Sequence, residues 1–236
     1  MVYYNKKMFE EIFVNRNNPF KTNSFMNTTD IINVIKGDVS YDMNIVQEKI
    51  SNLKYVEFEG DILKSNQNID KTNILGGIDL LLTDKEIKIP INEGLKEYFM
   101  YYNCFLLEKD DKIIFDSKDM PLFLMEIGKD YFQNYILNKE YANGMYIEYH
   151  NTPHYYISNE NFGGVIVLGK KINNKYKISA IKIPINKALY IPPYVLHNDC
   201  CLIGEYKVMY NMAEDFETVR LVDRENRMEF TKIVFI

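Results

Sequence analysis

From Tyr55 onward the chain is divided into short apolar or alternating runs, and this pattern constrains the fold more than any other feature of the sequence. Gly, Asp, Asn or Pro separates the runs, and runs this short between such residues are typical of β-strands. The expected strands cover residues 55–59, 77–82, 86–91, 103–107, 112–115, 122–127, 145–150, 154–158, 164–169, 176–183, 188–191, 200–203 and 207–212. Many short strands at close spacing predict a mainly β sandwich or barrel and disfavour a parallel α/β sheet.

The N-terminal part has a different period. Phe9, Ile12 and Phe13 recur at helical spacing, Thr29 can cap a short helix that ends at Gly37, and 45–53 has an amphipathic helical pattern. Residues 130–137 fit a helix or a strand equally well, because a short apolar run does not distinguish the two. We therefore expect three parts: a helical and loop segment at 1–54, a β-rich part at 55–130, and a barrel at 131–236.

A hexapeptide occurs twice in the chain. Ile-Lys-Ile-Pro-Ile-Asn covers 87–92 and again 181–186, and in this register Leu95 matches Leu189 and Asn103 matches His197. One interpretation is a duplication in which 55–130 is a degenerate second barrel that has lost its ligand. The alternative is coincidence in a chain rich in Ile, Lys and Asn.

Composition excludes some classes of function. The chain has 28 Lys and Arg against 33 Asp and Glu, for a net charge of -5, and basic residues are not clustered. This argues against a nucleic-acid partner, which would require a basic surface. The three cysteines, Cys104, Cys200 and Cys201, do not form a disulfide framework. Cys200 and Cys201 lie close after His197, where a thiol ligand or nucleophile is conceivable, but we expect these two to be small buried hydrophobes. The absence of a signal-peptide pattern or a long apolar stretch leads us to expect a cytoplasmic protein with no membrane partner.

All three histidines lie in the C-terminal part. His150 and His154 belong to the run Gly-Met-Tyr-Ile-Glu-Tyr-His-Asn-Thr-Pro-His at 144–154, and His197 follows the Pro192-Pro193 turn. Residues alternate between the two faces of a strand, so Glu148 and His150 share a face. Inward positions of a small barrel converge on one axis, which allows residues distant in sequence to meet.

The run Leu189-Tyr190-Ile191-Pro192-Pro193, followed by Val195 and His197, resembles the second motif of the cupin superfamily. The sequence of this motif is similar to that in nucleotide-sugar 3,4-ketoisomerases and related sugar epimerases. The resemblance implies a double-stranded β-helix, or jelly-roll barrel, with an α+β N-terminal portion. The first motif departs from the family pattern: three residues separate His150 from His154 where the family has one, and Glu160 lies further on than the family's glutamate.

Two kinds of chemistry fit these residues. A divalent Fe, Mn, Ni or Zn ion could be bound by His150, His154 and His197, with Glu148 or Glu160 as the carboxylate. Without a metal, a histidine could act as a general base. The resemblance to sugar epimerases implies a histidine base with a tyrosine acid, for which Tyr146, Tyr156, Tyr206 and Tyr210 are candidates. Our catalytic candidates are His150, His197 and Tyr210. The simpler alternative is that the histidines only form structural hydrogen bonds.

Three functions remain open on this basis. The first is metal-dependent isomerisation or epimerisation of a carbohydrate or sugar derivative. The second is an Fe(II)-dependent dioxygenase acting on a small molecule, and the third is a barrel that binds a sugar or other small molecule without catalysis. Exposed edge strands favour pairing, so a homodimer is also expected.

Overall fold

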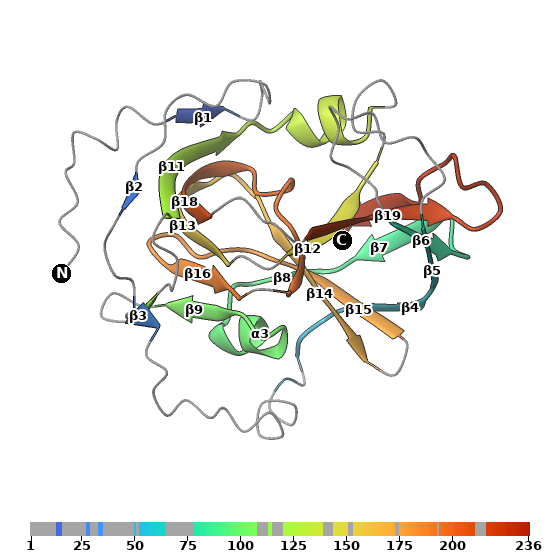
Figure 1. The fold of residues 1–236 in the computed structure, drawn as a ribbon, viewed down its shortest axis with the longest axis horizontal. Coiled ribbons are helices and arrows are strands. Elements are labelled where there is room, and N and C mark those ends of the chain that lie inside the picture. Colours follow the sequence, from blue (N-terminus) through green and yellow to red (C-terminus); the bar gives the residue numbers. More distant parts are fainter. Residues whose placement is uncertain are drawn as a thin grey trace.

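The computed structural model describes residues 13–15, 27–28, 33–34, 50, 52–64, 78–107, 113–114, 120–138, 144–150, 153–172, 175–192, 194–210 and 216–236. These residues form a mainly β structure with a nearly closed, barrel-like arrangement of sheets (Figure 1). The expectation of a β-barrel is confirmed. None of the helices in the described parts of the chain is long and apolar enough to span a bilayer.

Two large sheets make up the barrel. The first sheet contains, in spatial order, β1 (Phe13–Asn15), β11 (Met120–Ile127), β18 (Gly204–Tyr210), β13 (His154–Asn161), β16 (Ala188–Ile191) and β9 (Phe105–Leu107), with β2 (Asn27–Thr28) paired to β11. The second sheet contains β4 (Val56–Glu59), β15 (Lys175–Ile181), β14 (Ile166–Ile172), β17 (Leu196–Asn198), β12 (Tyr146–His150), β19 (Phe216–Asp223), β6 (Ile78–Leu82) and β5 (Asp61–Lys64), with β8 (Ile91–Asn92) paired to β15. In Figure 1, β11, β18 and β13 curve one inside the next on the side opposite β5 and β6.

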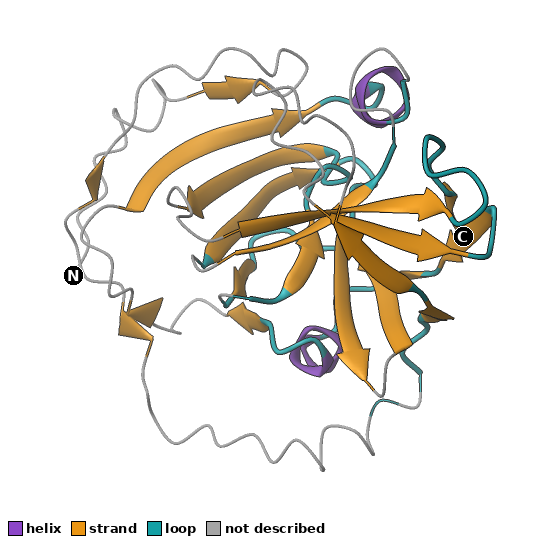
Figure 2. Cartoon of the chain, turned by 45° about the vertical axis from the view of Figure 1, so that its right-hand side comes forward, coloured by secondary structure: helices purple, strands orange, loops and turns teal. Residues whose placement is uncertain are grey.

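Smaller elements complete the described fold. β10 (Ile113–Ile114) pairs with β3 (Asn33–Val34), and β20 (Lys232–Phe235) runs parallel to β7 (Glu86–Ile89). Among the described residues, the helices are α3 (Lys96–Tyr101) and a single π-type turn, η1 (Phe132–Ile136). Figure 2 shows these two helical segments at opposite margins of the strands.

One hydrophobic core joins the two sheets. Met125, Leu189 and Val208 of the first sheet belong to the same buried cluster as Leu168 and Ile178 of the second, and all five are 0–2% exposed. β13 alternates between buried and half-buried residues along His154–Ser158, as expected for a strand with one face on the core. The inward face of β13 is therefore the face on which His154 and Tyr156 lie.

Most of the expected strands are present, and the differences have local causes. Residues 200–203 form a turn instead of a strand, because Asn198 Oδ1 accepts the Cys200 N–H and the Asp199 carbonyl accepts the Leu202 N–H. The ambiguous run at 130–137 is helical. The strands β5, β17, β19 and β20 and the helix α3 were not predicted from the pattern.

The helical expectation for the N-terminal part is wrong where the structure describes it. Phe13–Asn15 pairs in parallel with β11, and Asn33–Val34 pairs with β10. Strand pairing provides the backbone hydrogen bonds that a short isolated helix would have to form alone at a net cost. Of the expected run 45–53, the structure describes residues 50, 52 and 53, which form a turn closed by the bond from the Leu53 N–H to the Ile50 carbonyl. The rest of the expected helices, including Thr29 and Gly37, lies outside the described residues.

The two copies of the hexapeptide adopt different local structures. Asn92 is buried and its side chain bonds to both the N–H and the carbonyl of Lys54, whereas Asn186 is exposed in a turn with φ of 61°. The first copy is followed by α3, and the second by β16 and β17. β8 runs parallel to β15 and places Asn92 beside Ile181, so the end of one copy lies next to the start of the other. Whether the copies come from a duplication stays a prediction.

Candidate functional site

His154, His197 and Glu148 come together where the two sheets face each other. His154 is the first residue of β13, whereas His197 and Glu148 are direct partners across the β12–β17 pair. The two imidazole rings lie with centroids 4.9 Å apart and planes at 75°. His197 is 1% exposed and His154 is 7% exposed. The cluster thus bridges the sheets.

A turn before β17 sets the orientation of His197. Tyr194 has φ of 62°, a left-handed conformation that is uncommon for a residue with a side chain and that reverses the chain after Pro192. His197 Nδ1 lies 2.8 Å from the carbonyl oxygen of Val195. A carbonyl oxygen only accepts, so Nδ1 carries the hydrogen, and in the neutral ring the lone pair is on Nε2.

His197 Nε2 faces the carboxylate of Glu148, with 3.7 Å between Nε2 and Oε1. This distance is too long for a direct hydrogen bond. In the neutral form of His197 both atoms are acceptors, and two acceptors that face each other are stabilised by a proton or a cation between them. The pair is therefore suited to binding positive charge.

His154 belongs to a buried chain of three side chains. Its Nδ1 lies 2.8 Å from the hydroxyl oxygen of Tyr156, and that hydroxyl lies 3.0 Å from Oδ2 of Asp199. Tyr156 is 0% exposed and Asp199 is 2% exposed. A carboxylate only accepts, so the single hydroxyl hydrogen points to Asp199, and the Tyr156 oxygen accepts from His154 Nδ1. The lone pair of His154 is then on Nε2, as in His197.

Tyr210 adds a second phenol ring beside His154. It is the cross-strand partner of His154 in the β13–β18 pair, with ring centroids 5.0 Å apart and planes at 39°. Tyr210 is half-buried. Of the four candidate tyrosines, Tyr156 and Tyr210 lie against His154, while Tyr206 pairs with Ser158 further along β13, and burial raises its pKa.

Two predicted site residues are not part of the cluster as described: Glu160 lies elsewhere, and the side chain of His150 is outside the described residues. Glu160 is exposed and lies six positions beyond His154 in β13, about 20 Å away at the rise of a strand. It is also next to an irregularity in the pairing with β18. His150 follows Glu148 by two residues in β12 and pairs with Phe216, but its side chain is outside the described residues.

The donor atoms fit a divalent ion in type and, for one pair, in spacing. Two imidazole nitrogens and a carboxylate oxygen are ligands for Fe, Mn, Ni and Zn. Two bonds of about 2.1 Å at an angle of about 120° would span the 3.7 Å between His197 Nε2 and Glu148 Oε1. Within the described residues, no three His, Cys, Asp or Glu side chains already stand in a metal-binding arrangement. Binding would thus require a shift of His154, or His150 as a ligand.

Cys200 and Cys201 are buried like apolar residues, as expected, and Cys104 is buried as well. Cys104, Cys200 and Cys201 are 0–3% exposed and unpaired by disulfides. The Sγ atoms of Cys200 and Cys201 lie 3.6 Å apart, and burial raises the pKa of the Cys201 thiol. A high pKa favours the protonated thiol, which is a poor nucleophile and metal ligand.

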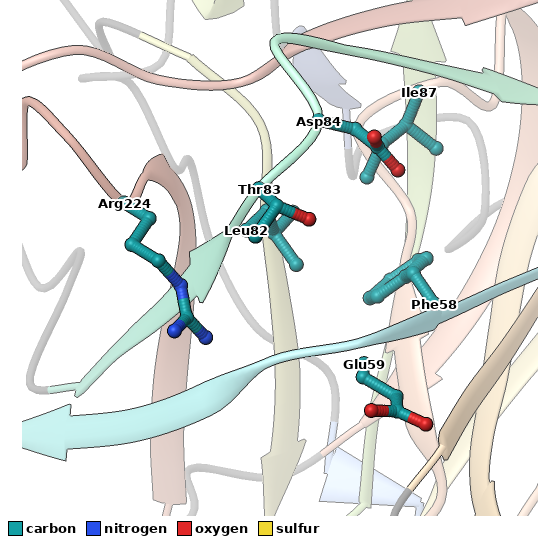
Figure 3. A pocket seen from close by; sticks show the side chains of 7 residues that line it. All are labelled: Phe58, Glu59, Leu82, Thr83, Asp84, Ile87 and Arg224. Carbon is teal, nitrogen blue, oxygen red and sulfur yellow. The ribbon is translucent and has the colours of Figure 1, made fainter.

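A separate cavity of about 300 Å³ lies near the end of β6. Phe58, Leu82 and Ile87 supply its apolar wall, and Glu59, Thr83, Asp84 and Arg224 supply polar groups. Figure 3 shows the Phe58 ring between the carboxylates of Asp84 and Glu59 in this view. Arg224 already donates to Asp61 Oδ2 at 2.7 Å. No residue predicted from the sequence as part of a site lines this cavity, and it lacks a histidine.

The sequence-based candidates did not include Asp199, and Tyr156 was named as a possible acid but not chosen among the catalytic residues. Asp199 stands two residues after His197, inside the second motif, and a carboxylate that close to a histidine was the available signal. Comparisons of the chain with protein-family models, curated proteins and solved structures found no match. The function of this protein is therefore inferred from its own residues.

Proposed function

We propose that this chain is a cupin-type enzyme that isomerises or epimerises a carbohydrate or sugar derivative with the help of a divalent metal ion. The main support is the pair formed by His197 Nε2 and Glu148 Oε1, which face each other at 3.7 Å beside a second imidazole, that of His154. Both imidazoles have Nδ1 beside a protein hydrogen-bond acceptor, which places the lone pair of the neutral ring on Nε2. A second support is the resemblance of the Leu189–His197 motif to sugar isomerases and epimerases.

Each side chain has a role in such a reaction. His154, with its lone pair on Nε2, removes a proton from the carbon next to a substrate carbonyl, and the Tyr210 hydroxyl donates a proton to the carbonyl oxygen. Return of the first proton to a different carbon, or to the other face of the same carbon, while the tyrosinate of Tyr210 takes a proton back from the enol hydroxyl, gives the isomer or the epimer. A metal ion held by Glu148, His197 and either His154 or His150 would polarise the carbonyl. Where His154 is the ligand, His150 becomes the candidate base.

The first experiment is elemental analysis of the protein purified without chelator, beside His197→Ala and a Glu160→Ala control. We expect near-stoichiometric Fe, Mn, Ni or Zn in the wild-type protein and in Glu160→Ala, since Glu160 is exposed and distant. We expect loss of the metal in His197→Ala. A wild-type protein that is metal-free and gains no thermal stability from any of the four added ions would contradict the metal-dependent mechanism.

An Fe(II)-dependent dioxygenase is the second candidate, and the donor set supports it. Two histidines and one carboxylate with open positions are the ligands of many non-haem Fe(II) oxygenases, and Glu148, His154 and His197 supply this set. Oxygen consumption by the iron-loaded protein with a small-molecule substrate would favour this reaction. Conversion of a sugar without oxygen uptake would favour isomerisation, and tight sugar binding without turnover would indicate a binding barrel.

A further inference from the structure

We infer that Asp199 and Tyr156 act as positioning residues that fix the hydrogen of His154 on Nδ1 and leave its Nε2 as the reactive nitrogen. The inference deepens the proposed function, because it assigns residues that prepare His154 for proton transfer or metal binding. It starts from two contacts, 2.8 Å between His154 Nδ1 and the Tyr156 hydroxyl and 3.0 Å between that hydroxyl and Asp199 Oδ2.

The direction of these hydrogen bonds follows from Asp199, the last residue of the hydrogen-bonded series. Asp199 as a carboxylate has no hydrogen to give, and the Tyr156 hydroxyl has only one. Once that hydrogen points to Asp199, the hydroxyl oxygen can only accept from His154. If the Tyr156 hydroxyl donated to His154 instead, its oxygen and the carboxylate of Asp199 would be two acceptors in contact, which is unfavourable in a buried site. The carboxylate thus determines the tautomer of a ring that it does not touch.

Burial makes this control effective. Asp199, Tyr156 and His154 are 2%, 0% and 7% exposed, so solvent competes weakly for these bonds. Two elements hold these three side chains in place: His154 and Tyr156 are on one face of β13, and Asp199 is in the turn after β17, where the Leu202 N–H bonds to its carbonyl. The Val195 carbonyl that holds His197 lies four residues before Asp199, so the short segment 195–199 orients both imidazoles.

The arrangement matches how proteins prepare histidines for metals and proton transfer. A ligand or catalytic histidine usually donates its other N–H to a carboxylate, a carbonyl or water, which fixes the ring and the tautomer. His197 uses the carbonyl of Val195 for this purpose. His154 uses a carboxylate through an intervening tyrosine, and this makes Tyr156 the residue to test.

The test is a long-range ¹H–¹⁵N correlation spectrum of the full chain labelled at histidine, at about pH 8, where ordinary imidazoles are neutral. The chain has 3 histidines, so three single substitutions assign the signals. We expect the Nδ1–H tautomer for His154 in the wild-type protein. In Tyr156→Phe we expect a shift toward the Nε2–H tautomer, with no change at His197.

Tyr206→Phe is the matched control, because it removes another buried tyrosine hydroxyl from the first sheet, at a residue paired with Ser158 instead of His154. It should leave the His154 tautomer unchanged. Asp199→Asn is the second variant, to be used if Tyr156→Phe does not fold. We expect it to give a mixture of tautomers at His154, because an amide can donate as well as accept. An unchanged His154 tautomer in a folded Tyr156→Phe or Asp199→Asn variant would overturn the inference.

A second readout separates this inference from the proposed function. Calorimetric titration with Zn²⁺ should give an affinity about 10–100-fold weaker in Tyr156→Phe than in the wild type, as for other residues that support metal ligands. If the tautomer shifts and no protein binds Zn²⁺, the positioning role stands and the metal-dependent function fails. If Zn²⁺ binds the wild type and Tyr156→Phe equally and the tautomer is unchanged, the function stands and the positioning role fails.

Discussion

Two polar clusters of the molecule differ in how their charged groups are paired: in one, donors face an acceptor, and in the other, two acceptors face each other. The ion cluster consists of Asp79 in β6, Arg220 in β19 and Arg227 in the segment after β19. Arg220 Nε donates to Asp79 Oδ1 at 2.8 Å, and Arg227 Nη2 donates to Oδ2 at 2.7 Å. The site cluster consists of Glu148, His154, Tyr156, His197, Asp199 and Tyr210. Its central pair, Glu148 and His197, faces at 3.7 Å with a lone pair on each side when His197 is neutral.

The difference separates a structural role from a functional one. In the ion cluster, charged donors point at a charged acceptor, and the bonds join two strands and the following segment. In the site cluster, acceptor faces acceptor, an arrangement that lowers stability until a proton or a cation lies between them. Folded proteins tolerate such local conflicts mainly at functional sites. The opposite responses of the two clusters to mutation test this distinction.

The largest expected effect is that of Asp79→Ala. Asp79 is 1% exposed, and its removal leaves the buried guanidinium of Arg220 without its carboxylate. Breaking one side of a buried ion pair typically lowers the free energy of unfolding by about 3–5 kcal/mol. Urea denaturation of the purified protein measures this change.

Asp61→Ala is the control for this prediction. Asp61 pairs with Arg224 at 2.7 Å, but the two side chains are 66% and 44% exposed. Exposed pairs contribute about 0–1 kcal/mol, so this variant should be nearly as stable as the wild type. Similar losses in both variants would show that burial is not what distinguishes the ion cluster.

Lys170 adds a third case to this comparison. Its charged group contacts an aromatic ring and a carbonyl oxygen, and not a carboxylate. Its Nζ lies 3.3 Å from the centroid of Tyr101 and donates to the Tyr101 carbonyl at 2.7 Å. Burial, followed by the charge of Lys177, lowers the pKa of Lys170 to about 8. The ordinary pKa in the unfolded chain is about 10.4, so the unfolded state binds more protons between these values. The free energy of unfolding should therefore rise as the pH increases from about 8 to about 10.

Lys170→Met should lose this part of the pH dependence. The measurement is the difference in the free energy of unfolding between variant and wild type at a series of pH values, which cancels the other titrating groups. Attraction between the ammonium and the Tyr101 ring favours the charged form and makes the effect smaller than burial alone would give. Identical pH dependence in the two proteins would mean that this attraction fully offsets the burial of the charge.

The sequence predicted the strand-rich fold well, because period-two alternation and turn residues are local signals. It failed where tertiary contacts decide. Phe13–Asn15 and Asn33–Val34 have partners about 80–110 residues away in β11 and β10, which no local pattern indicates. The two copies of Ile-Lys-Ile-Pro-Ile-Asn make the same point, since Asn92 is fixed by Lys54 whereas Asn186 lies in an exposed turn.

The candidate site was predictable in part for a related reason. His197 was chosen from its motif position and Glu148 from the strand face that it shares with His150, and the β12–β17 register makes Glu148 and His197 partners. Glu160 was chosen by its spacing from the histidines, but β13 continues through it and places it on the exposed end of the strand. Asp199 was missed because its contact with His154 passes through Tyr156, and a relay of this kind exists only in three dimensions.

The smallest expected change in stability, and the one with the opposite sign, is that of Glu148→Gln. The amide nitrogen can donate to His197 Nε2 and replaces an acceptor with a donor. We expect the free energy of unfolding to rise by about 0.5–1.5 kcal/mol, the net contribution of one hydrogen bond. Affinity for Zn²⁺ should fall by at least the roughly 10–100-fold loss seen for supporting residues, because a ligand is removed.

Glu160→Gln is the matched control, since Glu160 is exposed and distant from the cluster, and it should change neither quantity. Urea denaturation without metal and calorimetric titration with Zn²⁺ measure the two effects. A loss of stability in Glu148→Gln comparable to that in Asp79→Ala would mean that His197 is protonated at rest and forms an ion pair with Glu148. The site would then belong to the same structural kind as the ion cluster, and a metal ion would have to displace that proton to bind.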